Sequence, residues 1–173
     1  MPDATGLELV AAEVREALGD NAVAGTSYYR GQATLEIAPQ ATRDVVEFLM
    51  REAKEPYDFL ASLHGCDYFP EEPRLSVHYQ LLSRERIDRL CVKARLGADA
   101  PEVPSITELF PGAAFDERET YDMFGIVFTG NPDLRRILMP EDYVGWPQRR
   151  DFPIGGEPVI FTFNEKQMPR WYE

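Results

Sequence analysis

The residue types best suited to chemistry in this chain are two histidines and two cysteines. His64 and Cys66 stand two positions apart, whereas His78 and Cys91 lie far along the chain. A structural zinc site usually takes four ligands that come in close pairs, and no second pair is present. A catalytic Cys–His pair could form between distant residues, but His78 falls in an alternating segment typical of a strand. We therefore expect no metal site and favour a structural role for His78.

The glycines and cysteines indicate no bound cofactor. Gly155 and Gly156 belong to neither of the phosphate-binding patterns GxxxxGK and GxGxxG. The two cysteines are also too few for the disulfide framework of a small secreted protein. We expect two reduced cytosolic thiols, and a single disulfide stays open as the alternative. We expect no nucleotide, flavin or iron–sulfur site in this chain.

A group of carboxylates around residue 117 raises the question of acid–base catalysis or a hard-metal site. We expect a helix over residues 116–124, with Asp116 as its N-cap and Glu119 as the reciprocal partner. Arg118 and Asp122 are four apart and can pair on such a helix. Glu117 and Glu119 would project about 200° apart, so they would not face one substrate. A hydrolase built on these two residues is therefore the least favoured of the functions that we consider.

The stretch that follows this helix is dense in arginines and carboxylates and is interrupted by prolines. Arg–carboxylate pairs give directional, charge-assisted hydrogen bonds, which an extended segment needs in order to bind another protein's polar surface. The charged residues concerned are Asp133, Arg135, Arg136, Glu141, Asp142, Arg149, Arg150 and Asp151.

The elements that must position these residues follow from hydrophobic periodicity. Helical spacing predicts helices over residues 7–18, with a Thr5–Glu8 capping box, and from about Thr42 until Pro56. Period-two alternation predicts strands over residues 32–37, 74–81 and 89–96, with weaker candidates at 23–29 and 57–63. The expected fold is α+β: a two-layer sandwich of two helices on a mixed, mainly antiparallel sheet, in the order α-β-β-α-β-β-β, with an extended C-terminal arm. The polar sheet face would carry Arg74, Arg89, Lys93 and Arg95, and we favour a solvated face over a docking surface for an acidic partner.

Composition divides the 173 residues in two, since nine of the 14 prolines follow residue 100. We expect a compact domain over residues 1–100 and a partner-binding, proline-rich arm with one short helix over residues 101–173. The net charge of −12 argues against nucleic-acid or anionic-lipid binding as the main role. No apolar run approaches the ~20 residues of a membrane span, and the acidic N-terminus does not resemble a signal peptide.

Two blocks of the chain resemble the C subunit of NADH-quinone oxidoreductase, a component of respiratory complex I. The first block combines residues 117–119 (Glu-Arg-Glu) and 122–125 (Asp-Met-Phe-Gly) with residues 132–138 (Pro-Asp-Leu-Arg-Arg-Ile-Leu), and the second is residues 149–153 (Arg-Arg-Asp-Phe-Pro). Weaker likenesses occur at residues 58–60 and 65–68, so the resemblance covers most of the chain. One departure is Asn131, which stands where a histidine is expected before Pro-Asp-Leu.

The resemblance implies a cofactor-free component of the peripheral arm, on the cytoplasmic side of the cell membrane. Its C-terminal arm would wrap the D subunit, with the B and I subunits as neighbours, and flavin, iron–sulfur clusters and quinone would belong to partner subunits. The isolated chain would have no activity, and the interface residues would be Glu117, Arg118, Glu119, Asp122, Arg135, Arg136, Arg149, Arg150 and Asp151.

Two alternatives stay open. The chain could be the homologous subunit of a deazaflavin- or ferredoxin-dependent complex or of a membrane-bound hydrogenase, because the electron donor binds elsewhere. It could also be a free-standing acidic protein-binding module without a redox role.

Overall fold

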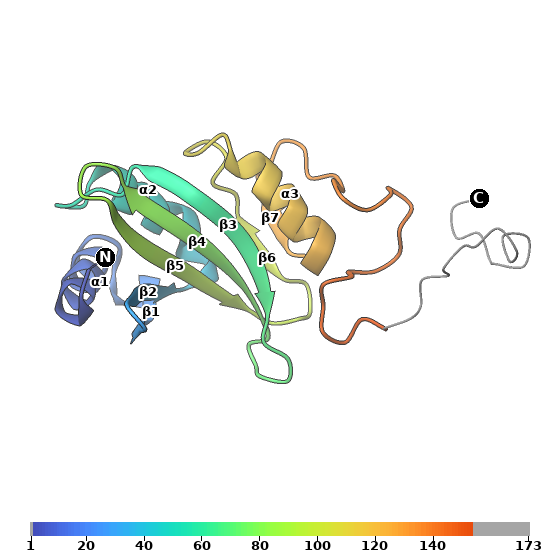
Figure 1. Ribbon diagram of the computed structural model, residues 1–173, viewed down its shortest axis with the longest axis horizontal. Coiled ribbons are helices and arrows are strands. Elements are labelled where there is room, and N and C mark those ends of the chain that lie inside the picture. Colours follow the sequence, from blue (N-terminus) through green and yellow to red (C-terminus); the bar gives the residue numbers. More distant parts are fainter. Residues whose placement is uncertain (1, 154–173) are drawn as a thin grey trace, which may run out of the picture.

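The computed structural model describes residues 2–153, which form a sheet domain followed by an arm that folds back against it (Figure 1). The helices are α1 (Ala4–Leu18), α2 (Thr42–Arg51) and α3 (Ala113–Phe124), with short 3₁₀ turns at Asp20–Ala22 and Pro39–Ala41. The strands are β1 (Val23–Tyr29), β2 (Gln32–Ile37), β3 (Phe59–Asp67), β4 (Leu75–Ser83), β5 (Asp88–Leu96), β6 (Glu102–Pro104) and β7 (Val127–Thr129).

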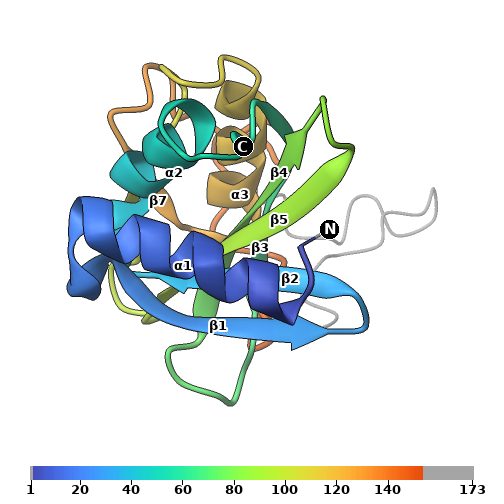
Figure 2. The same ribbon diagram turned by 90° about the vertical axis from the view of Figure 1, so that its left-hand side faces the viewer.

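The main sheet has five strands in the order β1-β2-β5-β4-β3. Strands β2 and β5 pair in parallel and every other neighbour pairs antiparallel, which confirms the predicted mixed, mainly antiparallel sheet. Helices α1 and α2 lie across this sheet (Figure 2) and contribute Leu7, Val14 and Leu49 to its core. The predicted order of the first seven elements is confirmed.

The alternation seen in the sequence is the reason for this packing. Leu75, Val77, Tyr79 and Leu81 of β4 are all fully buried, and the intervening residues point to the other face. The same holds for Leu35 of β2 and for the apolar side of β5. One face of the sheet therefore meets the helices and the other carries polar side chains.

The first helix begins earlier than its sequence suggested. Asp3, not Thr5, is the N-cap, and its carboxylate accepts the N–H of Gly6 at 2.7 Å. Glu8 accepts instead from the hydroxyl of Thr26 on β1, so the predicted capping box is wrong. Gly19 ends the helix as predicted, at a φ of 93° that favours glycine.

The packed core does not stop near residue 100, where we expected the compact domain to end. Strands β6 and β7 form a short parallel pair, and Val103, Ile106, Ile126 and Phe128 belong to the same hydrophobic core as the main sheet. Ile126 and Phe128 are thus fully buried within the chain. Residues 130–153 contain no helix or strand, and we call this segment the arm.

Helix α3 covers the edge strand β3 (Figure 1). Gly65 of β3 allows this approach, because a Cβ there would lie 2.5 Å from the ring of Phe124. Asp116 is not the N-cap, which is Gly112; its carboxylate accepts the outward N–H of Leu63 on β3 at 3.2 Å. The helix thus begins three residues earlier than predicted, because Ala113 and Ala114 extend it and Asp116 serves the strand edge.

Candidate interface: a polar clamp between the sheet domain and the arm

Asp122 is the centre of the contacts between α3 and the arm. Its side chain is fully buried and accepts the backbone N–H groups of Ile137, Leu138 and Met139 at 2.7–3.0 Å. The guanidinium of Arg136 donates to its other oxygen at 2.7 Å. Burial alone would raise the pKa of Asp122, but these four donors hold that pKa below its usual value. The carboxylate therefore fixes the path of the arm.

Arg136 makes several further contacts through its guanidinium group. It also donates to the carbonyl oxygens of Asp122 and Gly145, and its guanidinium lies over the ring of Trp146 with 4.7 Å to the centroid. The predicted Arg118–Asp122 pair is wrong. Arg118 reaches across to the carbonyl oxygens of Arg135 and Arg136 instead, because the arm runs along its side of α3.

A second buried carboxylate, Glu117, joins α3 to two other segments. It accepts from the hydroxyl of Ser105 and the N–H of Ile106, both at 2.8 Å, and from the amide of Asn131 at 2.8 Å. Burial raises the pKa of Glu117 by more than these three donors lower it. Asn131, the departure noted in the sequence, is a hydrogen-bonding residue that also accepts the N–H of Asp133.

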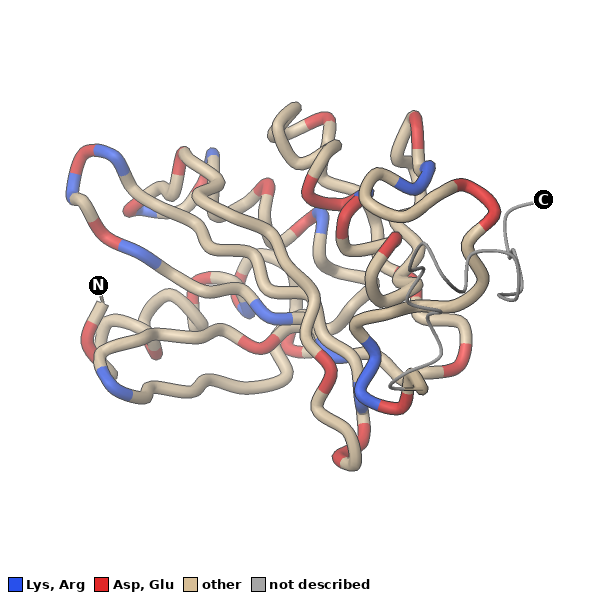
Figure 3. The backbone as a smooth tube through the Cα atoms, turned by 45° about the vertical axis from the view of Figure 1, so that its right-hand side comes forward, with Lys and Arg blue, Asp and Glu red and all other residues tan. Residues whose placement is uncertain are grey.

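The far end of the described arm is fixed by Arg74. This arginine is buried, not on the solvated sheet face as the alternation suggested, and it pairs with Asp67 at 2.6 Å and Asp151 at 2.5 Å. The Arg74 guanidinium holds the pKa of Asp67 far below its usual range, although burial opposes this. Asp67 also accepts the N–H of Arg150 at 2.7 Å. Figure 3 shows the basic and acidic stretches of this region side by side.

Seven of the nine predicted interface residues therefore join the arm to the rest of the chain, and we call them the polar clamp. Arg149 completes it by donating from Nε to the carbonyl of Phe124 at 2.7 Å. The other two lie outside the clamp: Glu119 is exposed, and Arg135 makes an exposed ion pair with Asp133, which is also in the arm. The members of the clamp are Glu117, Arg118, Asp122, Arg136, Arg149, Arg150 and Asp151.

Next to the clamp, large apolar side chains face solvent. Phe115 on the outer side of α3 is 62% exposed, Leu138 is 60% exposed and Val144 is 88% exposed. Ile137 is also exposed, while its backbone N–H is bound by Asp122. We call these four exposed apolar side chains, which lie on α3 and the arm, the arm surface (Phe115, Ile137, Leu138 and Val144). Large apolar side chains that stay exposed are candidates for protein–protein contact when they lie close together.

The histidines and cysteines meet on the polar sheet face but form no reactive site. Cys91 Sγ lies 3.5 Å from His78 Nδ1, and the other ring nitrogen of His78 contacts Tyr68 and Ser76. Burial lowers the pKa of His78 to about 4 and raises the pKa of Cys91 to about 11. At neutral pH the imidazole and the thiol are both uncharged, so neither a thiolate nor an ion pair forms. Within residues 2–153, no three His, Cys, Asp or Glu side chains are grouped to hold a metal ion.

Comparison with known proteins identifies the family. The family model described as "Respiratory-chain NADH dehydrogenase, 30 Kd subunit" matches residues 35–158, which include the clamp. The chain belongs to this family. It is 48% identical over 159 residues to the C subunit of NADH-quinone oxidoreductase from Roseiflexus castenholzii, covering 92% of this chain and 91% of that protein. It is 45% identical over 168 residues to the C subunit from Roseiflexus sp., covering 97% and 94%.

One solved structure agrees with this membership, and a second shares the fold. A structure titled "Nqo5 of the trypsin-resistant fragment (1-134)" has a TM-score of 0.54 and 33% identity, over 74% of this chain and 98% of that chain. A chain of the archaeal membrane-bound sulfane sulfur reductase has a TM-score of 0.68 over 96% of this chain and 94% of that chain; at 20% identity it shows the fold alone. Among the described residues of this family member, no helix is long and apolar enough to cross a membrane.

Proposed function

We propose that this family member is the C subunit of a proton-translocating NADH:quinone oxidoreductase, a cofactor-free component of its peripheral arm on the cytoplasmic side of the membrane. The observation that carries the proposal is the match over more than nine-tenths of two relatives that both bear the C-subunit name. Electron transfer from NADH to quinone then belongs to the assembly, and the chain's contribution is to shape and hold a protein surface.

The clamp supports this role because its charged residues are paired or hydrogen-bonded inside the chain. Asp122 and Arg74 satisfy the charges of the arm inside the chain, which leaves Leu138 and Val144 of the arm surface facing outward. A rigid apolar surface costs less ordering entropy on association than a free segment does. We propose that the arm surface packs against the D subunit and that the B and I subunits lie beside it.

Co-purification tests the proposal. The tagged chain should be isolated from native membranes in mild detergent, with the co-purifying subunits identified by mass spectrometry. We expect the NADH- and quinone-binding subunits to accompany it, with NADH:quinone activity. A chain that purifies alone would contradict the proposal and favour a free-standing binding module. Activity with reduced ferredoxin or deazaflavin but not with NADH would instead support the homologous complexes.

A pair of variants locates the contact. Leu138→Asp places a charge on the arm surface and should strongly reduce the chain's recovery in the complex. Ile87→Asp is the matched control, because Ile87 is 82% exposed on the turn between β4 and β5. Equal recovery of both variants would show that the arm surface is not the contact.

The proposed lack of a cofactor has its own test. Elemental analysis and an absorption spectrum of the isolated full chain should show no stoichiometric iron or zinc and no flavin band. NADH oxidation by the isolated chain should not exceed the background. Stoichiometric metal or bound flavin would overturn this part of the proposal without touching the family assignment.

A further inference from the structure

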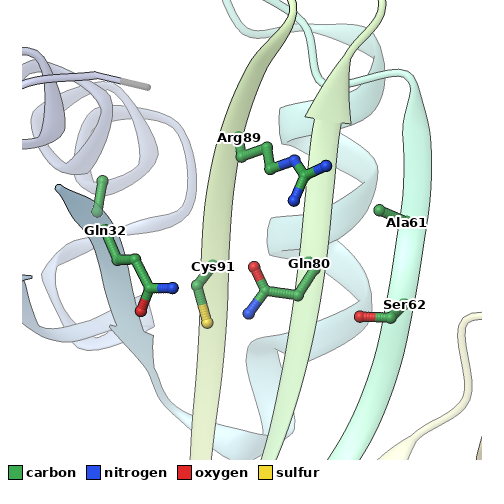
Figure 4. Close-up of a pocket in the computed structure, with 7 residues that line it drawn as sticks. Gln32, Ala61, Ser62, Gln80, Arg89 and Cys91 are labelled. Carbon is green, nitrogen blue, oxygen red and sulfur yellow. The ribbon is translucent and has the colours of Figure 1, made fainter. Parts of the chain in front are cut away.

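The polar face of the sheet contains a depression of about 280 Å³ between β2, β5, β4 and β3. It is separate from the clamp and from the arm surface. Figure 4 shows side chains from all four strands turned toward this space. Its lining residues are Gln32, Ala33, Ala61, Ser62, Gln80, Arg89 and Cys91, none of which is acidic.

Arg89 differs from the other cations that were expected on this face. Lys93 pairs with Glu36 at 2.9 Å, and Arg95 donates to the carbonyl of Pro73 and lies 3.8 Å from Glu71. Within residues 2–153, by contrast, the guanidinium of Arg89 has no hydrogen bond or ion pair, and the residue is exposed. Of the four cations expected on this face, Arg89 is therefore the one whose side chain has no partner among the described residues.

The groups around Arg89 define the ligand chemistry. A guanidinium binds a carboxylate through two parallel N–H donors. The amides of Gln32 and Gln80 and the hydroxyl of Ser62 supply further neutral donors, and Cys91 is uncharged. The apolar groups of the lining are small (Ala33, Ala61 and the Cys91 thiol) and lie beside amide, hydroxyl and guanidinium donors, so a carboxylate on a short stem suits the depression. Because the depression opens on a broad strand surface, a side chain projecting from another protein can enter it.

We propose that this depression is a docking site for an Asp or Glu side chain of a neighbouring subunit, with Arg89 as the residue that pairs with it. The inference rests on the proposed function, because it requires an assembly. It adds a second contact, on the sheet face, to the one proposed for the arm surface. Charge complementarity carries it: an unpaired guanidinium among neutral donors, on a chain whose other sheet-face cations are all satisfied.

Arginine-selective labelling tests the proposal directly. The free full chain and the purified complex should be treated with phenylglyoxal, and modified peptides should be quantified by mass spectrometry. We expect Arg89 to react in the free chain and to react about tenfold more slowly in the complex. Equal reactivity in both states would overturn the docking site. Slow reaction already in the free chain would also overturn it, because the chain itself would then occupy the depression.

Charge reversal gives a second measurement. Arg89→Glu should lower the chain's affinity for the rest of the complex about tenfold or more, while Arg89→Lys should retain part of it. Arg15→Glu is the matched control, since Arg15 lies on α1, which packs on the opposite face of the sheet. Thermal unfolding of the free Arg89→Glu chain should match the unmodified chain, which separates lost docking from lost folding. Equal losses for Arg15→Glu and Arg89→Glu would contradict the proposal.

The alternatives give different results. If the depression bound a small free carboxylate, succinate or citrate would protect Arg89 in the isolated chain and raise its unfolding temperature, and the proposal would be wrong. If a second copy of the chain filled it, sedimentation would show a dimer that Arg89→Glu dissociates, which would also refute it. A chain that never co-purifies with other subunits would refute the proposed function itself. A chain that co-purifies with Arg89 still reactive would refute only this inference.

Discussion

Asp122 and Arg136 form a buried ion pair between α3 and the arm, with Arg136 Nη1 2.7 Å from Asp122 Oδ1. The side chain of Asp122 is fully buried and that of Arg136 is 11% exposed. Because the carboxylate also binds three consecutive backbone N–H groups of the arm, the pair fixes both a side chain and a stretch of backbone. Removing one partner of this pair should therefore cost more than removing one partner of an exposed pair of the same chemistry.

Asp122→Asn should destabilise the free chain by about 3 kcal/mol, because it leaves the buried guanidinium of Arg136 without a counter-charge. Urea unfolding measures the change in free energy. Asp133→Asn is the control: Asp133 pairs with Arg135 on the surface, with both side chains about half exposed, and should change the free energy of unfolding by less than about 1 kcal/mol. Similar losses for the two variants would mean that the buried pair is not what holds the arm.

Glu117 should make stability fall as the pH rises. Burial raises its pKa in the folded chain above that of an unfolded glutamate, so its favourable contribution is complete below the unfolded pKa of about 4.5. That contribution is then lost as the pH passes through the raised, folded pKa. Glu117→Gln removes this loss, so the stability of the variant relative to the unmodified chain should increase from about pH 4 to about pH 7.

Urea unfolding at a series of pH values tests this dependence. Glu119→Gln is the matched control, because Glu119 is exposed on the same helix and makes none of the contacts of Glu117. A constant difference between Glu117→Gln and the unmodified chain across that range would contradict the assignment of the pH dependence to Glu117.

The sequence predicted the sheet well because its signal is local. In β4 the alternation of Leu75, Val77 and Tyr79 alone assigns a buried face, and the structure confirms it. Strands β6 and β7 are only three residues long, so Val103 and Phe128 carry no periodic signal. Proline frequency therefore suggested a domain boundary near residue 100, whereas the hydrophobic core continues beyond it.

The pairing of the charged residues was not predictable for a different reason. Helical spacing offers Arg118 as the partner of Asp122, but the actual partner, Arg136, is fourteen residues away through a segment without regular structure. Arg74 likewise meets Asp151 across 77 positions. The sequence identified which residue types matter, whereas their pairing depends on the path of the arm, which no local pattern encodes.

Gly65 should be intolerant of any side chain. A Cβ at this position would lie 2.5 Å from the ring of Phe124, which packs α3 against the edge of β3. We expect Gly65→Ala to destabilise the chain by about 1–3 kcal/mol, because the helix must shift or the ring must leave its rotamer. Gly97→Ala, where a Cβ meets nothing within 4 Å, should have little effect. Thermal unfolding of both variants tests this prediction. A Gly65→Ala chain as stable as the unmodified chain would show that α3 is not tightly fixed on β3.

Substitutions of Arg149 and Arg135 should distinguish the contribution of the clamp to the folded chain from a contribution to assembly. Arg149 is half-buried and donates to the carbonyl of Phe124 at 2.7 Å, so Arg149→Ala should release the end of the described arm in the free chain. Hydrogen exchange should then become faster at the amides of Arg150 and Phe152, which are bound to Asp67 and to the carbonyl of Arg149.

Arg135→Ala should leave that exchange unchanged, because its side chain pairs with Asp133, which lies on the surface beside it. Both variants should nevertheless lower the amount of assembled enzyme, Arg149→Ala by loosening the arm and Arg135→Ala by removing an outward charge. Activity per assembled complex should stay nearly normal in both. Normal assembly with a large loss of specific activity would instead indicate that these arginines serve the quinone chemistry directly.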